Sequence, residues 1–175
     1  MVTVSRPTVR SRAEAAVAAV LRTRTAPLSV DLALIAVRIA LTWIFVYYGA
    51  AKLFGWFNGP GIHGAAIYFA NTAHLRPGEF FAVFAGVIEF GGAIAVALGF
   101  FSRLAALALF GDMVMAMITV SWANGINSLQ VAAGYEFNVA LAVLALVIVL
   151  LGAGRFSIDA LAEPLVAASK RGSGR

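Results

Sequence analysis

The chain has 175 residues, of which 62% are hydrophobic and 12% charged, with a mean hydropathy of +0.92. Soluble domains are about half apolar and about a quarter charged, so this composition excludes an ordinary globular domain and indicates an integral membrane protein. The net charge is +5. The sequence contains no cysteine, and this absence excludes disulfides, thiolate catalysis and cysteine-bound zinc or iron–sulfur clusters.

Residues 1–29 form a basic segment. Ser11 and Glu14 have the spacing of a capping box, and an apolar stripe follows at helical spacing, which predicts a short amphipathic helix on the inner leaflet. The apolar run ends in Arg22 and Arg24, unlike a signal peptide, whereas an organellar transit peptide stays open as an alternative. The basic ends lack interleaved aromatic residues, so nucleic acid is not an expected partner.

Four apolar stretches of near-bilayer length follow, at about residues 30–54, 80–101, 104–123 and 137–154. They lack the alternation of barrel strands, and helices are the other structure that satisfies the backbone in lipid. The sequence therefore predicts an all-α membrane protein with a four-transmembrane-helix bundle over 30–160. A basic, flexible tail is expected over 161–175.

Lysine and arginine positions predict the orientation. With the N-terminus inside, ten of these residues fall on the cytoplasmic side and two, Lys52 and Arg76, on the outer side, while Arg38 lies within a helix. This is a positive-inside bias, so we expect a multi-pass protein of the cytoplasmic membrane, in contact with lipid, with both termini in the cytoplasm.

Five ionisable residues lie within or at the ends of the apolar stretches: Arg38, Lys52, Glu89, Asp112 and Glu136. A charged group at a helix centre costs roughly 2.5–3.5 kcal/mol, so these groups are expected to meet inside the bundle. Depths counted at about 1.5 Å per residue predict a mid-membrane cluster of Arg38, Asp112 and Glu89. The same count predicts an outer pair of Lys52 and Glu136.

These charges have a structural and a functional interpretation. Ion pairs can simply fix helix register. Two acids that share one arginine also suit proton exchange or binding of a polar head group, and Tyr48 is a further candidate to hydrogen-bond a ligand. His63 and His74 lack metal-ligand spacing, so no metal site is expected.

Several short motifs resemble the DoxX family of small four-helix membrane proteins, over about residues 30 to 165. Their order and spacing carry the resemblance rather than any single motif. They are Arg38, Tyr48–Gly55 (YGAAKLFG), Ile88–Gly92 (IEFGG), Leu98–Arg103 (LGFFSR), Asn127–Leu129 (NSL), Gly134–Glu136 (GYE) and Gly152–Asp159 (GAGRFSID).

The resemblance implies a four-helix bundle linked to redox metabolism, since relatives include a subunit of a thiosulfate:quinone oxidoreductase. The resemblance implies that five polar positions are important for function: Arg38, Lys52, Glu89, Arg103 and Glu136. It also identifies five positions of the family motifs: Gly49, Gly91, Gly92, Asn127 and Arg155. The chain departs from the family pattern at Tyr48 and Ser121, where histidines are common, so histidine-based chemistry is not expected here.

The leading hypothesis is a membrane subunit of a redox system that binds a quinone or similar lipid-soluble molecule at the charged cluster. A soluble partner protein would supply the electrons, because the sequence holds no evident cofactor ligands of its own. A membrane anchor for soluble partners and a small proton-coupled transporter are the alternatives. Whether the chain is catalytic, and whether it forms a homo-oligomer, stay open.

Overall fold

The computed structural model describes residues 27–126 and 134–163, and this part of the chain is helical and contains no strand. The predicted amphipathic N-terminal helix, Asn127 and most of the C-terminal tail lie outside the described residues. The helices are α2 (Leu28–Phe54), a 3-10 turn (Trp56–Asn58), α3 (Gly61–Asn71), α4 (Gly78–Leu98), α5 (Ser102–Ala116), a π-helical turn (Met117–Ser121), a 3-10 turn (Trp122–Asn124) and α6 (Glu136–Leu151).

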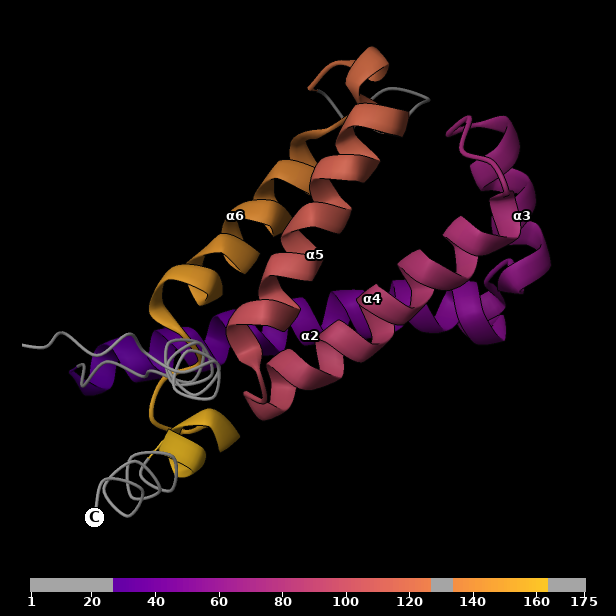
Figure 1. The fold of residues 1–175 in the computed structure, drawn as a ribbon. Helices are drawn as coiled ribbons and strands as arrows, with labels where there is room; N and C mark the ends of the chain where they lie inside the picture. The colour runs from indigo at the N-terminus through magenta and orange to yellow at the C-terminus, as the bar shows by residue number, and fades with distance from the viewer. Residues whose placement is uncertain (1–26, 127–133, 164–175) are drawn as a thin grey trace, which may run out of the picture.

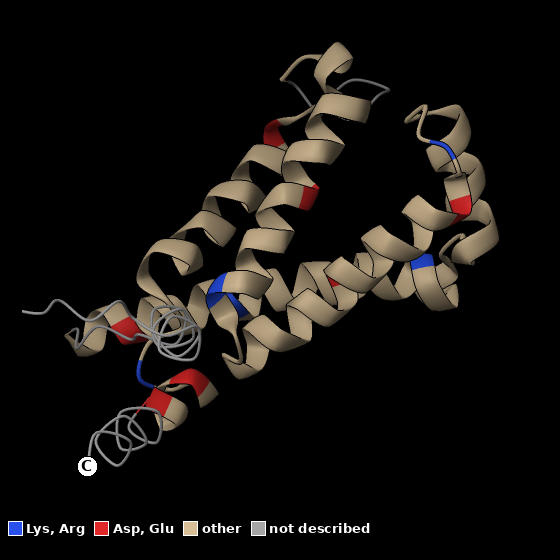
Figure 2. Ribbon diagram, viewed as in Figure 1, with Lys and Arg blue, Asp and Glu red and all other residues tan. Residues whose placement is uncertain are grey.

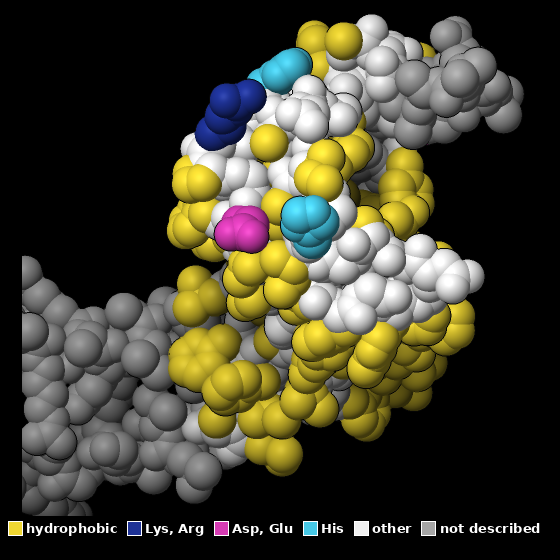
Figure 3. Space-filling model, turned by 90° about the vertical axis from the view of Figure 1, so that its right-hand side faces the viewer, with side chains coloured by type: hydrophobic (Ala, Val, Ile, Leu, Met, Phe, Trp, Pro, Cys, Tyr) yellow, Lys and Arg dark blue, Asp and Glu magenta, His cyan; other side chains and the backbone are white. Residues whose placement is uncertain are grey.

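Three of the described helical segments are long and apolar enough to cross a membrane: α2, α4 and the stretch Ser102–Asn124 that begins with α5. The apolar helix α6 is shorter, with 16 residues. Figure 3 shows hydrophobic side chains over much of the lower part of the described surface on one face, below the charged and histidine side chains. Such a surface is suited to contact with lipid, as the composition predicts.

The helices form two packed pairs. α2 packs mainly on α4, and α5 packs mainly on α6; α4 also contacts α5, and α3 packs on α4. Figure 1 shows the α5–α6 pair leaning away from α3, so that the two pairs diverge from a common end. The core between them is apolar and includes Leu41, Phe45, Val96, Leu109 and Ile148.

Polar contacts hold together the end where the pairs meet, which we call the closed end. It comprises the start of α2, the α4–α5 turn and residues 152–159. Asp31 of α2, which is 1% exposed, accepts hydrogen bonds from the backbone and side chain of Arg155. The Asp159 carboxylate accepts from the backbone amides of Phe101 and Ser102 at 2.8 and 2.9 Å, so it caps the start of α5.

Glycine allows the close approach of α2 and α4. A Cβ atom added at Gly49 would lie 2.5 Å from the backbone nitrogen of Phe90, whereas one added at Gly91 would meet no atom within 4 Å. We expect Gly49→Ala to lower the unfolding free energy by about 1–3 kcal/mol, because the helices must move apart. Gly91→Ala should be neutral or slightly stabilising, because alanine favours the helix.

The two variants serve as a matched pair, since each adds one methyl group to a helical glycine of the same family motif set. Unfolding in mixed micelles titrated with dodecyl sulfate, followed by circular dichroism, measures the difference. Equal stability of Gly49→Ala and Gly91→Ala would contradict the close approach of α2 and α4.

Candidate functional site

A cavity of about 670 Å³ lies between the α2–α4 pair and the α5–α6 pair, and we call it the central cavity. Side chains from α2, α3, α4, α5 and α6 line it, together with the π-helical turn that follows α5. Most of this lining is apolar and aromatic. An apolar cavity with a few convergent polar groups is the usual form of a small-molecule site.

The polar groups of the central cavity come from three helices. Lys52 of α2 donates to both carboxylate oxygens of Glu89 of α4, at 2.7 and 2.6 Å. Asp112 of α5 lies beside this pair and interacts electrostatically with both partners. The Lys52 ammonium also lies 5.6 Å from the centroid of the Tyr48 ring, within the range of a cation–π interaction. Lys52, Glu89 and Asp112 form what we call the charged cluster.

The charged cluster is largely shielded from solvent, with Glu89 buried and Lys52 and Asp112 partly buried. The side chain of Glu89 is 5% exposed and that of Lys52 is 22% exposed. The Oδ2 atom of Asp112 is buried and has no hydrogen-bond partner among the described residues. One ammonium group faces two carboxyl groups, so the cluster has a formal charge of −1 unless it holds a proton. A cluster of charged side chains of this kind can exchange a proton with a bound molecule.

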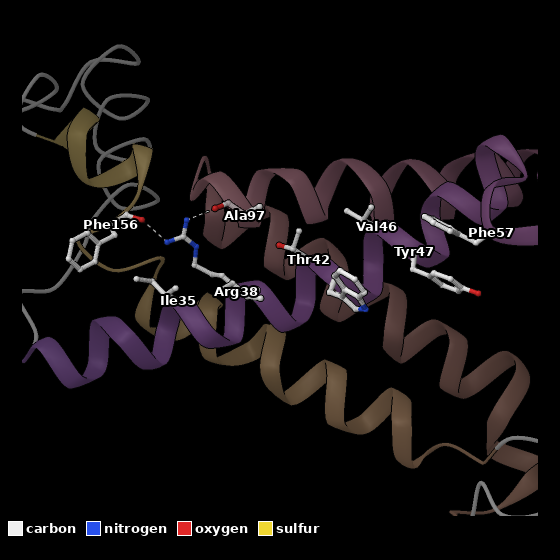
Figure 4. A pocket seen from close by; sticks show the side chains of 10 residues that line it. Ile35, Arg38, Thr42, Val46, Tyr47, Phe57, Ala97 and Phe156 are labelled. Atoms are coloured by element: carbon white, nitrogen blue, oxygen red, sulfur yellow. Dashed lines mark hydrogen bonds between the residues drawn. The ribbon is translucent and has the colours of Figure 1, made fainter.

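The predicted cluster brought Arg38 together with Glu89 and Asp112: the two acids do lie together, whereas the position of Arg38 is wrong. The Arg38 guanidinium, 6% exposed, instead donates to four backbone carbonyls at the closed end. These are the carbonyls of Val96 and Ala97 at the end of α4 and of Ala153 and Phe156 after α6. Figure 4 shows two of these bonds, to Ala97 and Phe156. Figure 2 shows that the charged residues lie at separate places along the helices.

The predicted partner of Lys52 was also wrong, because Lys52 pairs with Glu89 and not with Glu136. Side chains on a helix lean toward its N-terminus, and α2 and α4 are antiparallel. Lys52 therefore leans toward the middle of the bundle while Glu89 leans toward the end of α2, so they meet. Arg38 leans toward the start of α2, away from both acids.

Arg38 lies at one end of a second groove, of about 540 Å³, on the other side of α2. Trp43, Tyr47 and Phe57 lie along the groove, as Figure 4 shows for the last two. All four hydrogen bonds of Arg38 go to the protein backbone, so its main role is to join segments at the closed end.

The other predicted positions are spread over the fold. Tyr48 lines the central cavity, and Glu136 is the first residue of α6. Arg103 donates to the carbonyl of Val149 at 3.0 Å, and Arg155 binds Asp31, so both contribute to helix packing at or near the closed end. Gly92 faces Leu109 of α5.

Sequence reasoning missed three residues that the structure brings into prominence. Asp31 and Asp159 were not singled out, although Asp159 ends one of the family motifs and Asp31 shares a helical face with Arg38. Ser121, noted only as a departure from the family pattern, is 5% exposed and lines the central cavity. Its hydroxyl oxygen has no hydrogen-bond partner among the described residues.

The comparisons with known proteins agree with the motifs. The sequence matches the family model named DoxX over residues 33–122, a range that contains Lys52, Glu89, Asp112 and Ser121. No curated protein and no solved structure matches the chain. The family match covers just over half of the 175 residues. The chain belongs to the DoxX family.

Proposed function

We propose that this protein is the membrane subunit of a quinone-linked redox system and that it binds a quinone, or a similar lipid-soluble molecule, in the central cavity. The observation that carries the proposal is the position of the charged cluster, which is buried in the wall of an otherwise apolar and aromatic cavity within a membrane protein. Apolar walls suit a hydrophobic ring, and the cluster offers hydrogen bonds to its oxygens.

We further propose that α6 is a fourth transmembrane helix and that both termini face the cytoplasm. A helix of 16 residues is about 24 Å long, close to the hydrocarbon thickness of about 30 Å. The closed end holds the start of α2, the end of α4, the start of α5 and the end of α6, as expected for four spans of alternating direction. The positive-inside count supports a cytoplasmic position for this end and favours the cell membrane as the location.

The residues of the charged cluster fit the chemistry of a quinone, which when bound would supply two-electron, two-proton redox chemistry. An ammonium group has three N–H donors, and Lys52 uses two of them on Glu89, which leaves one for a ligand oxygen. Asp112, when protonated, donates a second hydrogen bond. Glu89 holds the Lys52 ammonium in place, and the two acids store or release a proton.

Electrons would come from a soluble partner protein at the cytoplasmic surface. The sequence contains no cysteine, and no group of three or more metal-ligating side chains occurs within 27–126 and 134–163. The chain would therefore bind the lipid-soluble molecule and handle its protons, while the partner handles electrons.

The test is mass spectrometry of the lipids that remain bound after purification from native membranes in mild detergent. We expect about one quinone per wild-type chain and loss of the quinone from Glu89→Gln, because the amide has no charge and only one acceptor oxygen for the Lys52 ammonium. Glu79→Gln, the same change at an exposed position on the same helix, is the matched control and should retain the quinone.

Phospholipid alone in the wild-type protein would contradict quinone binding. The membrane-anchor hypothesis would then be favoured, and the charged cluster would be interpreted as a device that fixes helix register. Equal retention of quinone by Glu89→Gln and wild type, at equal stability, would place the ligand elsewhere in the protein.

A further inference from the structure

The central cavity contains two buried polar atoms without a hydrogen-bond partner among the described residues, Asp112 Oδ2 and Ser121 Oγ. Such atoms are rare in folded proteins, since a buried polar group left unpaired costs about 1–3 kcal/mol. Both residues line the cavity. Their occurrence together indicates that a molecule other than the protein satisfies them.

The π-helical turn brings the second of these atoms to the cavity. Ser121 lies nine positions after Asp112, and at about 100° per residue an α-helix would place them roughly on opposite faces. The wider turn at Met117–Ser121 changes this phase, and Ser121 lines the same cavity as Asp112. Turns of this kind occur frequently at functional sites.

The charge of the cluster selects among ligands. The Lys52 ammonium is bonded to both oxygens of Glu89, and the Oδ2 atom of Asp112 has no donor among the described residues. Two carboxyl groups against one ammonium leave an excess of one negative charge when both are ionised. A buried excess charge is costly in an apolar environment, and a positively charged ligand would neutralise it.

The rest of the cavity wall is suited to the same class of ligand. Aromatic rings from four helices line it, among them Tyr48, Tyr68, Phe84 and Phe137. The face of an aromatic ring attracts a cation within about 6 Å, and aromatic walls also accept apolar substituents. A carboxylate with one unpaired oxygen beside aromatic walls is suited to recognise organic cations.

We propose that the central cavity binds lipophilic organic cations, with the positive charge at Asp112 and the apolar groups against the aromatic wall. Ser121, about 13 Å from Asp112 along the helix axis, offers a hydrogen bond to cations long enough to reach it. The inference goes beyond the proposed function, because it concerns the same cavity but does not require a quinone or a redox partner.

The cation would compete with a proton for Asp112, so binding should tighten as the pH rises. Glu89 of α4 and Lys52 of α2 interact with Asp112, and the other titratable groups that line the cavity are Tyr48 of α2 and Tyr68 of α3. Burial raises the pKa of the Tyr68 phenol, so this phenol stays neutral while the pH rises through the neutral region. From α6 the cavity receives only the uncharged side chains of Phe137, Asn138 and Leu141, within the described residues.

The test uses the full chain in detergent. Equilibrium dialysis measures its affinity for radiolabelled tetraphenylphosphonium, with triphenylphosphine oxide as the neutral counterpart. We expect the wild type to bind the cation roughly tenfold or more tightly than the neutral probe, and more tightly at higher pH. Asp112→Asn should reduce cation affinity by about tenfold, because an amide carries no charge. Glu79→Gln, an exposed acid-to-amide change, should leave the affinity unchanged.

Equal binding of the charged and neutral probes by the wild-type protein would overturn the proposal, and this comparison needs no variant to fold. Full cation affinity in a folded Asp112→Asn protein would overturn it as well. Quinone in the purified protein without cation binding would contradict this inference and leave the proposed function standing. Cation binding without quinone would support the inference and contradict the proposed function.

Discussion

An Arg38→Met variant is expected to lose about 3 kcal/mol or more of unfolding free energy. Hydrogen bonds to a charged group contribute about 1.5–3 kcal/mol each, and Arg38 makes four, to the end of α4 and to the segment after α6. The four share one guanidinium, so their contributions do not add in full. Methionine fills a similar volume, and the loss therefore reports the hydrogen bonds more than a cavity.

Two further variants make the Arg38 measurement specific. Arg38→Lys keeps the charge but replaces a planar fork by a single ammonium, so we expect an intermediate loss. Arg76→Met removes an exposed arginine outside the described helices and should change stability by no more than about 0.5 kcal/mol. Dodecyl sulfate titration of all three proteins gives the comparison; unchanged stability of Arg38→Met would show that the closed end does not depend on this side chain.

Composition and hydropathy predicted the helices because lipid restricts the backbone so strongly. Long apolar runs bounded by glycine, proline or charge correspond to α2, α4 and the Ser102–Asn124 stretch, three helices that the structure shows as candidate spans. The order of short motifs predicted the family, which the match over residues 33–122 confirmed. The presence of charges inside the bundle was predicted for the same reason, since unpaired charges in lipid are costly.

The partners of these charges could not be predicted from depth along a helix axis. The count at 1.5 Å per residue locates Cα atoms, whereas lysine and arginine are long and lean toward the N-terminus of their own helix. This lean moves Lys52 and Glu89 toward one another and moves Arg38 toward the α4 carbonyls. Backbone acceptors at a helix end were also left out of the sequence argument, although the last carbonyls of any helix lack partners within it.

The orientation of Ser121 shows a second limit of sequence reasoning. A regular helical wheel places this residue away from Asp112, and the residues Met117–Ser121 carry no proline or glycine to mark a change of helical phase. The Thr119 hydroxyl donates to the carbonyl of Met115 at 2.7 Å, a contact of the kind that bends helices. This local competition, visible only in three dimensions, accompanies the π turn that brings Ser121 to the cavity.

A Lys52→Met variant is expected to lose about 3–5 kcal/mol of stability at neutral pH, because Glu89, 4% exposed, would be left beside Asp112 without a cation. The folded variant escapes part of this cost by taking up protons. The folded state then binds more protons than the unfolded state, in which free carboxylates are ionised at neutral pH. Its stability should therefore fall as the pH rises, and the loss should shrink in acid.

The double variant Lys52→Met/Glu89→Gln separates the buried charge from the loss of the lysine side chain. If the cost comes from an uncompensated carboxylate, removing that carboxylate should restore most of the stability, with a coupling energy of about 2–3 kcal/mol and a much weaker pH dependence. If the double variant is as unstable as Lys52→Met alone, the ion pair is not the origin of the loss. The same proteins test the ligand site, because the double variant also lacks the Glu89 carboxylate and, like Glu89→Gln, should lose the quinone.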